Sequence, residues 1–213
     1  MVDFSIITAR RDPETLGACV RSLRKHHDGV VHIHAEPGEY RVDFDNVKIE
    51  VHAQKKGCFA NHHHALLESL RRGGDVLCVL SDDLLFGDGL EGGIRSAERL
   101  LSGEAAACCL FTHWDNGAQD KYRASGWVED KDGKLSWNGV FVMRKDFVKK
   151  LISHEYYVNH LNNGSGMNID SCIHETIKQM GLKSYCHNPS LCCTIGVSTI
   201  GHTHFSDGLN FRK

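Results

Sequence analysis

Short apolar runs alternate with segments of helical periodicity along most of the chain, and this alternation constrains the fold more than any other feature. The β-rich run 2–9 is followed by Asp12-Pro13-Glu14, a pattern typical of a helix start. Leu16, Val20 and Leu23 then recur at helical spacing and predict one buried face. Repetition of this unit predicts an α/β fold, a single domain with a mostly parallel, twisted central sheet flanked by helices. Ligands of such sheets bind at the carboxyl ends of the strands.

The same alternation continues through most of the remaining sequence. Further strands are expected at 30–35, 47–52, 76–80, 106–112 and 140–144, and further helices from about 59 to 73, around 90–101, at 146–152 and at 168–180. The segment 113–137 is polar and shows no clear period. Because structureless loops of this length are uncommon in compact domains, we predict that this segment is a functional loop facing a substrate.

The charge balance and the cysteines exclude several classes of protein. The 25 basic residues nearly cancel the 27 acidic ones, so there is no broad basic field for binding nucleic acid. The longest apolar runs fall far short of the roughly 20 residues that span a membrane, and the N-terminus does not resemble a secretion signal. Nine cysteines without a Cys-x-x-Cys pair suit a reducing compartment. We therefore expect a cytoplasmic protein that is not secreted and has no membrane span.

Two adjacent carboxylates stand where a buried strand is expected to end. Ser81-Asp82-Asp83 follows the apolar run 76–80 and precedes Leu84-Leu85-Phe86. In a parallel sheet this position opens onto the ligand-binding edge. A divalent cation held there by carboxylate oxygen would stabilise the negative charge that grows on a departing diphosphate. Taken alone, the motif is more typical of a solvated acidic turn.

Further motifs accompany the acidic pair in a defined order. They are Phe4-Ser5-Ile6-Ile7-Thr8-Ala9-Arg10 with Pro13-Glu14-Thr15-Leu16, Asn61 before Ala65-Leu66, Val79-Leu80-Ser81-Asp82-Asp83, Asn138-Gly139-Val140-Phe141-Val142-Met143-Arg144, Asn168-Ile169-Asp170 and Gly201-His202-Thr203-His204. In combination they resemble the GT-A class of nucleotide-sugar glycosyltransferases over nearly the whole chain. The chain also resembles the N-terminal glycosyltransferase domain of a larger chlorella-virus protein, which implies a longer polypeptide in the host cytoplasm.

The resemblance implies one Rossmann-like GT-A domain over 1–213. Its first half, 1–112, would bind the nucleotide, and its second half, 113–213, would bind the acceptor and complete a metal site. Residues that would grip the nucleoside and its phosphates are Thr8, Arg11, Lys56, Gly57 and Asn61, together with Ser81, Asp82 and Asp83. For Lys56 a solvated charge and for Asn61 a helix cap or surface amide are equally good interpretations.

The same resemblance implies a bound Mn²⁺ or Mg²⁺. Asp83 would be the metal ligand, and Asp82 would contact the ribose or the sugar. Ser81 stands where the usual signature has a carboxylate, so one carboxylate fewer is present for the ribose contact. His202 or His204 would complete the metal shell, since imidazole is a common ligand of transition metals. The triplet His62-His63-His64 points in different directions on a helix, so we do not expect it to chelate one ion as a unit.

Two acidic residues are candidates for catalysis and contact with the acceptor. In inverting members of the class, a carboxylate in the region of Asp170 deprotonates the acceptor hydroxyl, whereas retaining members need no base there. The position of Asp170 near a helix start also explains it without catalysis. Asp115 lies in the polar segment, beside which Trp137 and Asn138 suit a sugar acceptor. The sequence does not separate inversion from retention.

The leading hypothesis is transfer of a hexosyl unit from a UDP-sugar to a carbohydrate hydroxyl. One alternative is a sugar-phosphate nucleotidyltransferase, although the turn Ala9-Arg10-Arg11-Asp12 lacks the glycines of a phosphate-binding loop. Another is a carbohydrate- or nucleotide-binding module without catalytic activity.

Overall fold

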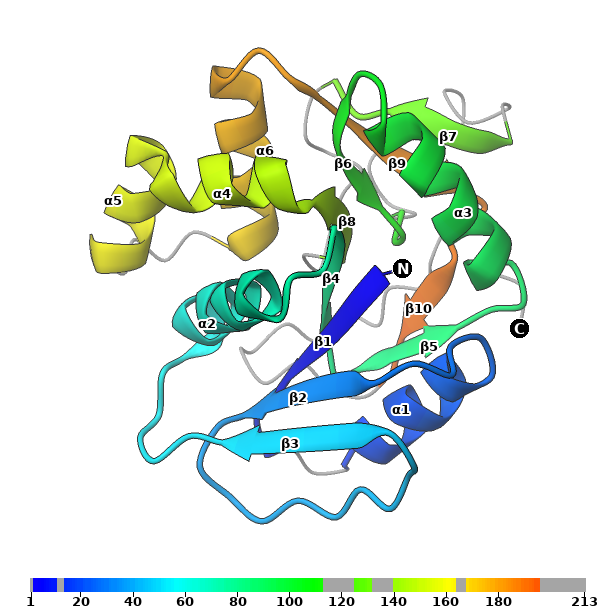
Figure 1. Cartoon of the computed structure of the whole chain (residues 1–213), viewed down its shortest axis with the longest axis vertical. Helices are drawn as coiled ribbons and strands as arrows, with labels where there is room; N and C mark the ends of the chain where they lie inside the picture. The colour runs from blue at the N-terminus through cyan, green and yellow to red at the C-terminus, as the bar shows by residue number, and fades with distance from the viewer. Residues whose placement is uncertain (1, 11–13, 113–124, 132–139, 164–167, 196–213) are drawn as a thin grey trace.

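An eight-stranded mixed sheet runs through the computed structural model, which describes residues 2–10, 14–112, 125–131, 140–163 and 168–195 (Figure 1). Its strands, in spatial order, are β3 (Val47–Val51), β2 (Val31–Ala35), β1 (Val2–Thr8), β4 (Val76–Ser81), β8 (Phe141–Arg144), β6 (Ala105–Cys109), β9 (Lys183–Asn188) and β7 (Gly126–Glu129). A separate two-stranded ribbon pairs β5 (Leu84–Phe86) with β10 (Cys192–Thr194). The described chain is therefore a single α/β domain, as the sequence predicts.

Most of the strands point the same way. β3, β2, β1 and β4 are mutually parallel. β8 pairs antiparallel with both β4 and β6, which makes β6 and its parallel neighbour β9 run in the direction of β4. The carboxyl ends of β1, β2, β3, β4, β6 and β9 consequently share one edge of the sheet, called the carboxyl edge below. The opposite edge, where these strands begin, is called the amino edge.

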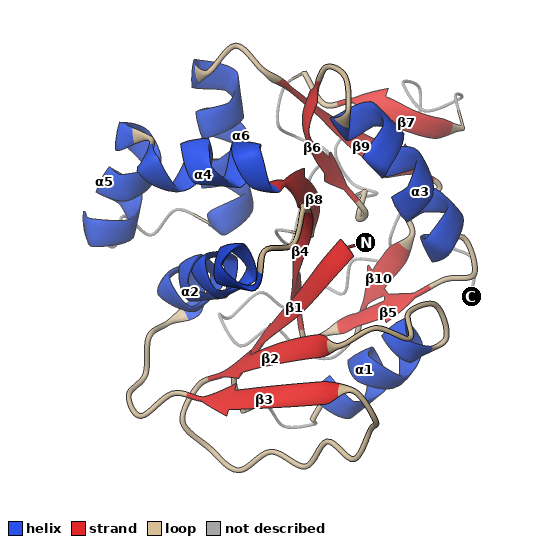
Figure 2. Ribbon diagram, in the orientation of Figure 1, coloured by secondary structure: helices blue, strands red, loops and turns tan. Residues whose placement is uncertain are grey.

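Six helices of the described chain cover the two faces of the sheet (Figure 2). They are α1 (Leu16–Arg24), α2 (Cys58–Arg72), α3 (Leu90–Leu101), α4 (Lys145–Ser153), α5 (Glu155–Asn163) and α6 (Ile169–Gln179). α2 packs on β1 and β4, α4 on β8 and α6 on β9, whereas α1 packs on β5 and α3 on β6 and β8. Figure 1 shows α1 and α3 on one side of the sheet and α2, α4, α5 and α6 on the other.

The middle of the sheet is buried on both faces. Phe4 and Ile6 of β1, and Leu77 and Leu80 of β4, are at most 1% exposed, and the same core takes in Phe141 of β8. Helices on both faces explain why β4 and β8 read as continuous apolar runs rather than as an alternation of apolar and polar residues. The polar residues that follow such runs are thereby delivered to the sheet edge.

Most predicted elements are present, with shifted boundaries. The helix expected near Pro13 begins at Leu16 with Thr15 as its N-cap, while Asp12 and Pro13 lie outside the described residues. α2 ends as predicted at Gly73, whose φ of 82° is the left-handed conformation that favours glycine after a helix. The prediction of one long loop over 113–137 is wrong in part, because 126–129 form β7 and pair with β9. Pairing with another strand, rather than local pattern, stabilises this short strand.

No helix among the described residues is long and apolar enough to cross a bilayer.

Candidate functional site

The acidic pair lies at the carboxyl edge, in the middle of the sheet. Asp82 and Asp83 form the turn that follows β4. Asp82 is 1% exposed, and the Thr8 hydroxyl at the end of β1 donates a 2.5 Å hydrogen bond to its Oδ2. The Ser81 hydroxyl donates to Oδ1 of Asp83 at 2.6 Å. Two strand ends thus place a buried carboxylate and a partly exposed one side by side.

The C-terminal part of the described chain returns to this pair. β10 pairs antiparallel with β5, and its last residue, Thr194, lies opposite Leu84. The Ile195 amide then donates a 2.6 Å hydrogen bond to the backbone carbonyl of Asp83. The last described residue, Ile195, therefore lies beside Asp83, and His202 and His204 follow it in the sequence.

A third carboxylate, Glu36, stands at the same edge, directly after β2. Its side chain is buried and accepts hydrogen bonds of 2.8 Å from the backbone amides of both Lys56 and Gly57. Gly57 has a φ of 80°, a conformation that L side chains rarely adopt, and it is the N-cap of α2. Glu36 therefore fixes the backbone of the loop before α2. The side chain of Lys56, which belongs to this loop, is exposed.

Asn61 is buried in α2 and both ends of its amide are engaged. Its Nδ2 donates to the carbonyl of His34 at 3.0 Å, and its Oδ1 lies 2.9 Å from Nε2 of His52. Burial lowers the pKa of His34 to about 4 despite the neighbouring carboxylate of Glu50, so its imidazole is neutral at pH 7. Asn61 thus joins the ends of β2 and β3 to the first turn of α2.

Tyr40 hydrogen-bonds Glu36 and lies near enough to Asp82 to feel its charge. Its hydroxyl donates a 2.9 Å hydrogen bond to the carbonyl of Glu36. Burial and the nearby charge of Asp82 both raise the pKa of Tyr40, since each disfavours the phenolate. The phenol therefore stays protonated and supplies a polar group at the carboxyl edge.

Asp170 is placed at the carboxyl edge by topology. α6 leads through Gly181 to the start of β9 at the amino edge, so the first turn of α6 faces the other way. Asp170 is buried there, and Asn168 is the N-cap without a side-chain capping bond. The site therefore gathers residues from β1, β2 and β4 and from the loop before α2, and the approach of Asp170 to them stays a prediction.

Several predicted site residues lie outside the described residues. These are Arg11, Asp115, Trp137, Asn138, His202 and His204. Their assigned roles stay predictions, as do those of the described residues Thr8, Lys56, Gly57, Asn61, Ser81, Asp82, Asp83 and Asp170.

The histidine triplet divides between packing and surface, as expected. His62 is 2% exposed, and burial lowers its pKa to about 3. His63 stacks against Tyr157 of α5, whereas His64 contacts Glu50 of β3. Trp127 likewise packs within the domain, and its indole N–H donates to Ser96 of α3 at 2.7 Å.

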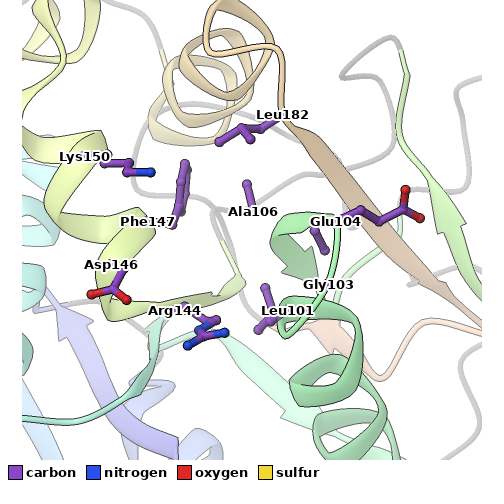
Figure 3. Close-up of a pocket in the computed structure, with 10 residues that line it drawn as sticks. Leu101, Gly103, Glu104, Ala106, Arg144, Asp146, Phe147, Lys150 and Leu182 are labelled. Carbon is purple, nitrogen blue, oxygen red and sulfur yellow. The ribbon is translucent and has the colours of Figure 1, made fainter.

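A cavity of about 240 Å³ lies at the amino edge, away from the acidic pair (Figure 3). Arg144 at the end of β8, Ala106 of β6 and Phe147 of α4 line it together with Glu104 and Lys150. Because ligands of α/β sheets bind at the carboxyl ends of the strands, this cavity is not the candidate site.

Sequence reasoning missed Glu36 and Tyr40. Glu36 had a usable signal, since it follows the predicted strand 30–35 as Ser81 follows the strand 76–80. Tyr40 had none, because a loop of irregular conformation brings it back to Glu36.

Comparison with known proteins shows the fold only. No family model and no curated protein matches this chain. Among solved structures, a Bacillus anthracis protein assigned as a glucose-1-phosphate thymidylyltransferase, in complex with sucrose, aligns with a TM-score of 0.57 at 10% identity over 91% of this chain and 89% of its own. A Thermus thermophilus mannose-1-phosphate geranyltransferase aligns at 0.55 and 13% identity over 88% and 74%. Residues 1–349 of Staphylococcus aureus TarS align at 0.56 and 10% identity over 89% and 59%.

Proposed function

We propose that this chain is a glycosyltransferase that moves a hexosyl unit from a UDP-sugar to a carbohydrate hydroxyl with the help of Mn²⁺ or Mg²⁺. The observation that carries the proposal is the turn after β4. It presents a partly exposed carboxylate, Asp83, beside a buried one, Asp82, that Thr8 holds in place. Two of the proteins that share the fold are described as transferases acting on sugar 1-phosphates, which supports a transferase of the nucleotide-sugar kind.

The donor set at this turn fits a hard divalent cation. Asp83 offers carboxylate oxygen at the open edge of the sheet, and a bound Mn²⁺ or Mg²⁺ would neutralise the charge of the diphosphate leaving group. His202 or His204 would complete the metal shell from the sequence that follows Ile195. Asp82, oriented by Thr8, would contact the sugar or ribose hydroxyls.

The loop before α2 would receive the nucleotide. Glu36 holds this loop through the backbone amides of Lys56 and Gly57, so neither amide is available to a phosphate. The exposed ammonium group of Lys56 would therefore attract the diphosphate by charge. Thr8 and Asn61 already hydrogen-bond other residues, and their role in donor binding would be to orient Asp82 and the start of α2.

Asp170 would act as the general base. A carboxylate at the carboxyl edge can accept the proton of an acceptor hydroxyl that attacks the sugar, provided that it lies within hydrogen-bond reach. Asp115, Trp137 and Asn138 would hold the acceptor. This assignment corresponds to direct inversion at the sugar carbon.

A sugar-phosphate nucleotidyltransferase is the second candidate, and the fold shared with the Bacillus anthracis protein favours it. The two reactions have different products. A nucleotidyltransferase releases pyrophosphate from UTP and a sugar 1-phosphate, whereas a glycosyltransferase releases UDP from a UDP-sugar. A non-catalytic module would do neither.

The test combines binding with turnover. We expect millimolar UDP and Mn²⁺ together to raise the Tm of the chain, because a ligand that binds only the native state stabilises it. Slow hydrolysis of a UDP-sugar, assayed across a panel of donors without acceptor, should release UDP. No Tm shift would overturn the proposal, and pyrophosphate release from UTP with a sugar 1-phosphate would select the second candidate.

A further inference from the structure

Two histidines and a glutamate from three separate elements converge at the α2 side of β2 and β3. Nδ1 of His34, on β2, lies 3.1 Å from one carboxylate oxygen of Glu50, on β3. Nε2 of His64, on α2, lies 3.0 Å from the other carboxylate oxygen. The three donor atoms all lie within 4.8 Å of one another. This group is called the His34 cluster below.

These separations are close to those of a tetrahedral zinc site. Zinc binds imidazole nitrogen and carboxylate oxygen at about 2.0–2.2 Å, so neighbouring ligands of a tetrahedral site lie roughly 3.3 Å apart. Both contacts of Glu50 meet this distance within a few tenths of an ångström. Only the gap between the two imidazoles must close, and Glu50, with half of its side chain exposed, is free to adjust.

His52 lies beside the His34 cluster, and Asn61 places the proton of its ring. Nδ2 of Asn61 donates to the His34 carbonyl, which fixes the amide so that Oδ1 faces His52. Oδ1 only accepts, so Nε2 of His52 carries the proton. Its other ring nitrogen, Nδ1, lies 3.7 Å from Oε1 of Glu50.

The outer contacts of the cluster also match those of metal ligands. Histidines that bind metals usually hydrogen-bond a carbonyl, carboxylate or water through the other ring nitrogen, which fixes the tautomer. His52 makes such a bond with Asn61, and Nε2 of His34 lies 3.5 Å from the Ser5 hydroxyl. Ser5 in turn accepts a hydrogen bond from Arg72.

We propose that His34, Glu50 and His64 form a zinc site, with His52 beside it. The histidine side chains are 3%, 4% and 20% exposed for His34, His52 and His64, whereas Glu50 is 50% exposed and leaves an entry path from solvent. The site is distinct from the acidic turn after β4. Zinc there joins β2, the edge strand β3 and α2, and through Asn61 it holds the start of α2.

The test measures zinc directly and does not use transfer activity. The chain is stripped of metal with a chelator, and zinc is then titrated by calorimetry and counted by elemental analysis. We expect one zinc per chain, with a rise in Tm of at least about 5 °C at zinc 100-fold above its Kd. Cobalt(II) in the same site should give the visible absorption bands of four-coordinate cobalt.

Matched variants locate the ion. Glu50→Gln keeps the shape of an exposed edge-strand side chain and His64→Ala alters a helix surface, so both variants should fold. Each should weaken zinc binding at least 10-fold. This is the lower limit, because removing a residue that only supports a metal ligand already lowers metal affinity about 10-fold. His160→Ala on α5, Cys58→Ser and Asp83→Ala should bind zinc as the parent does.

The outcomes are decisive in both directions. Weaker zinc binding in Glu50→Gln and His64→Ala, with unchanged binding in the three control variants, supports the site. Zinc retained by both variants, or lost in Cys58→Ser, assigns the ion to another place and overturns the proposal. A parent chain that binds no zinc at micromolar concentration also overturns it, and the cluster is then a hydrogen-bonded network of Glu50 with its histidines.

Discussion

Carboxylates lie at both edges of the sheet, and their interactions at the two edges are of different kinds. At the amino edge they pair with cations: Asp3 with Arg72 at 2.6 Å, Asp75 with Lys145 at 2.9 Å and Glu104 with Lys183 at 2.6 Å. At the carboxyl edge they accept hydrogen bonds from hydroxyls and backbone amides, as Asp82 does from Thr8, Asp83 from Ser81 and Glu36 from the loop before α2.

This difference separates two uses of a carboxylate. An ion pair within the protein neutralises its charge, whereas hydrogen bonds from hydroxyls and backbone amides orient it. We therefore expect changes at the amino edge to affect stability and changes at the carboxyl edge to affect binding and catalysis. The predictions below test this division.

The largest effect is expected at Asp170. Asp170→Asn keeps the shape of the side chain but cannot take a proton, so transfer should slow roughly 10²–10⁴-fold, the usual contribution of a general base. UDP affinity should not change, because the base acts on the acceptor. Initial rates with saturating donor measure the effect. An unchanged rate would leave Asp170 as a residue that stabilises the start of α6.

Thr8→Val should have the next largest effect. The substitution keeps the volume but removes the hydroxyl that donates to buried Asp82, and a hydrogen bond to a charged group contributes about 1.5–3 kcal/mol. Urea unfolding gives the stability, and UDP binding with Mn²⁺ should weaken in parallel. Thr8→Ser, which retains the hydroxyl, is the matched control and should restore most of the binding.

Asp3→Asn should affect stability alone. Burial alone would raise the pKa of Asp3, but hydrogen bonds from Arg72 and Ser69 outweigh it and hold the pKa below its usual value of about 3.9. The lowered pKa contributes stability that is present above about pH 4 and is lost as pH falls through the folded pKa. We expect a loss of about 1–2 kcal/mol at pH 7, reduced by solvent screening, which fades as pH falls through the folded pKa of Asp3. Weaker UDP binding in this variant would break the division between the edges.

The smallest effect is expected for Asp75→Asn. Asp75 is exposed and pairs with Lys145 in solvent, where ion pairs contribute little. Neither the urea midpoint nor UDP binding should change measurably. A change in UDP binding would show that the amino edge also serves the ligand.

The sequence predicts the central part of the fold well. The strand β4 carries a continuous apolar run, β1, β2 and β3 are rich in β-branched apolar residues, and the helical spacing of α2 and α3 ends close to Gly73 and Gly103, so local pattern and tertiary structure agree. β5, β7 and β10 are short, and pairing with distant partners rather than local pattern sets them. α5 is also missed, since Tyr157 is its sole buried described residue and leaves almost no apolar stripe.

The candidate site divides in the same way. Ser81-Asp82-Asp83 was predictable because it ends a buried strand. The contact of Thr8 with Asp82 and the grip of Glu36 on the loop before α2 depend on strand register, which the sequence pattern does not specify. The His34 cluster joins positions scattered over β2, β3 and α2, so only the fold reveals it.

The most direct test of the donor site is calorimetric titration of UDP with Mn²⁺ into the parent, Asp83→Ala and Asp75→Ala. We predict that the parent and Asp75→Ala bind UDP equally, that Asp83→Ala loses the manganese-dependent part of the binding, and that all three unfold at similar urea concentrations. Equal manganese-dependent binding of UDP by Asp83→Ala and the parent would contradict the assignment of the acidic turn.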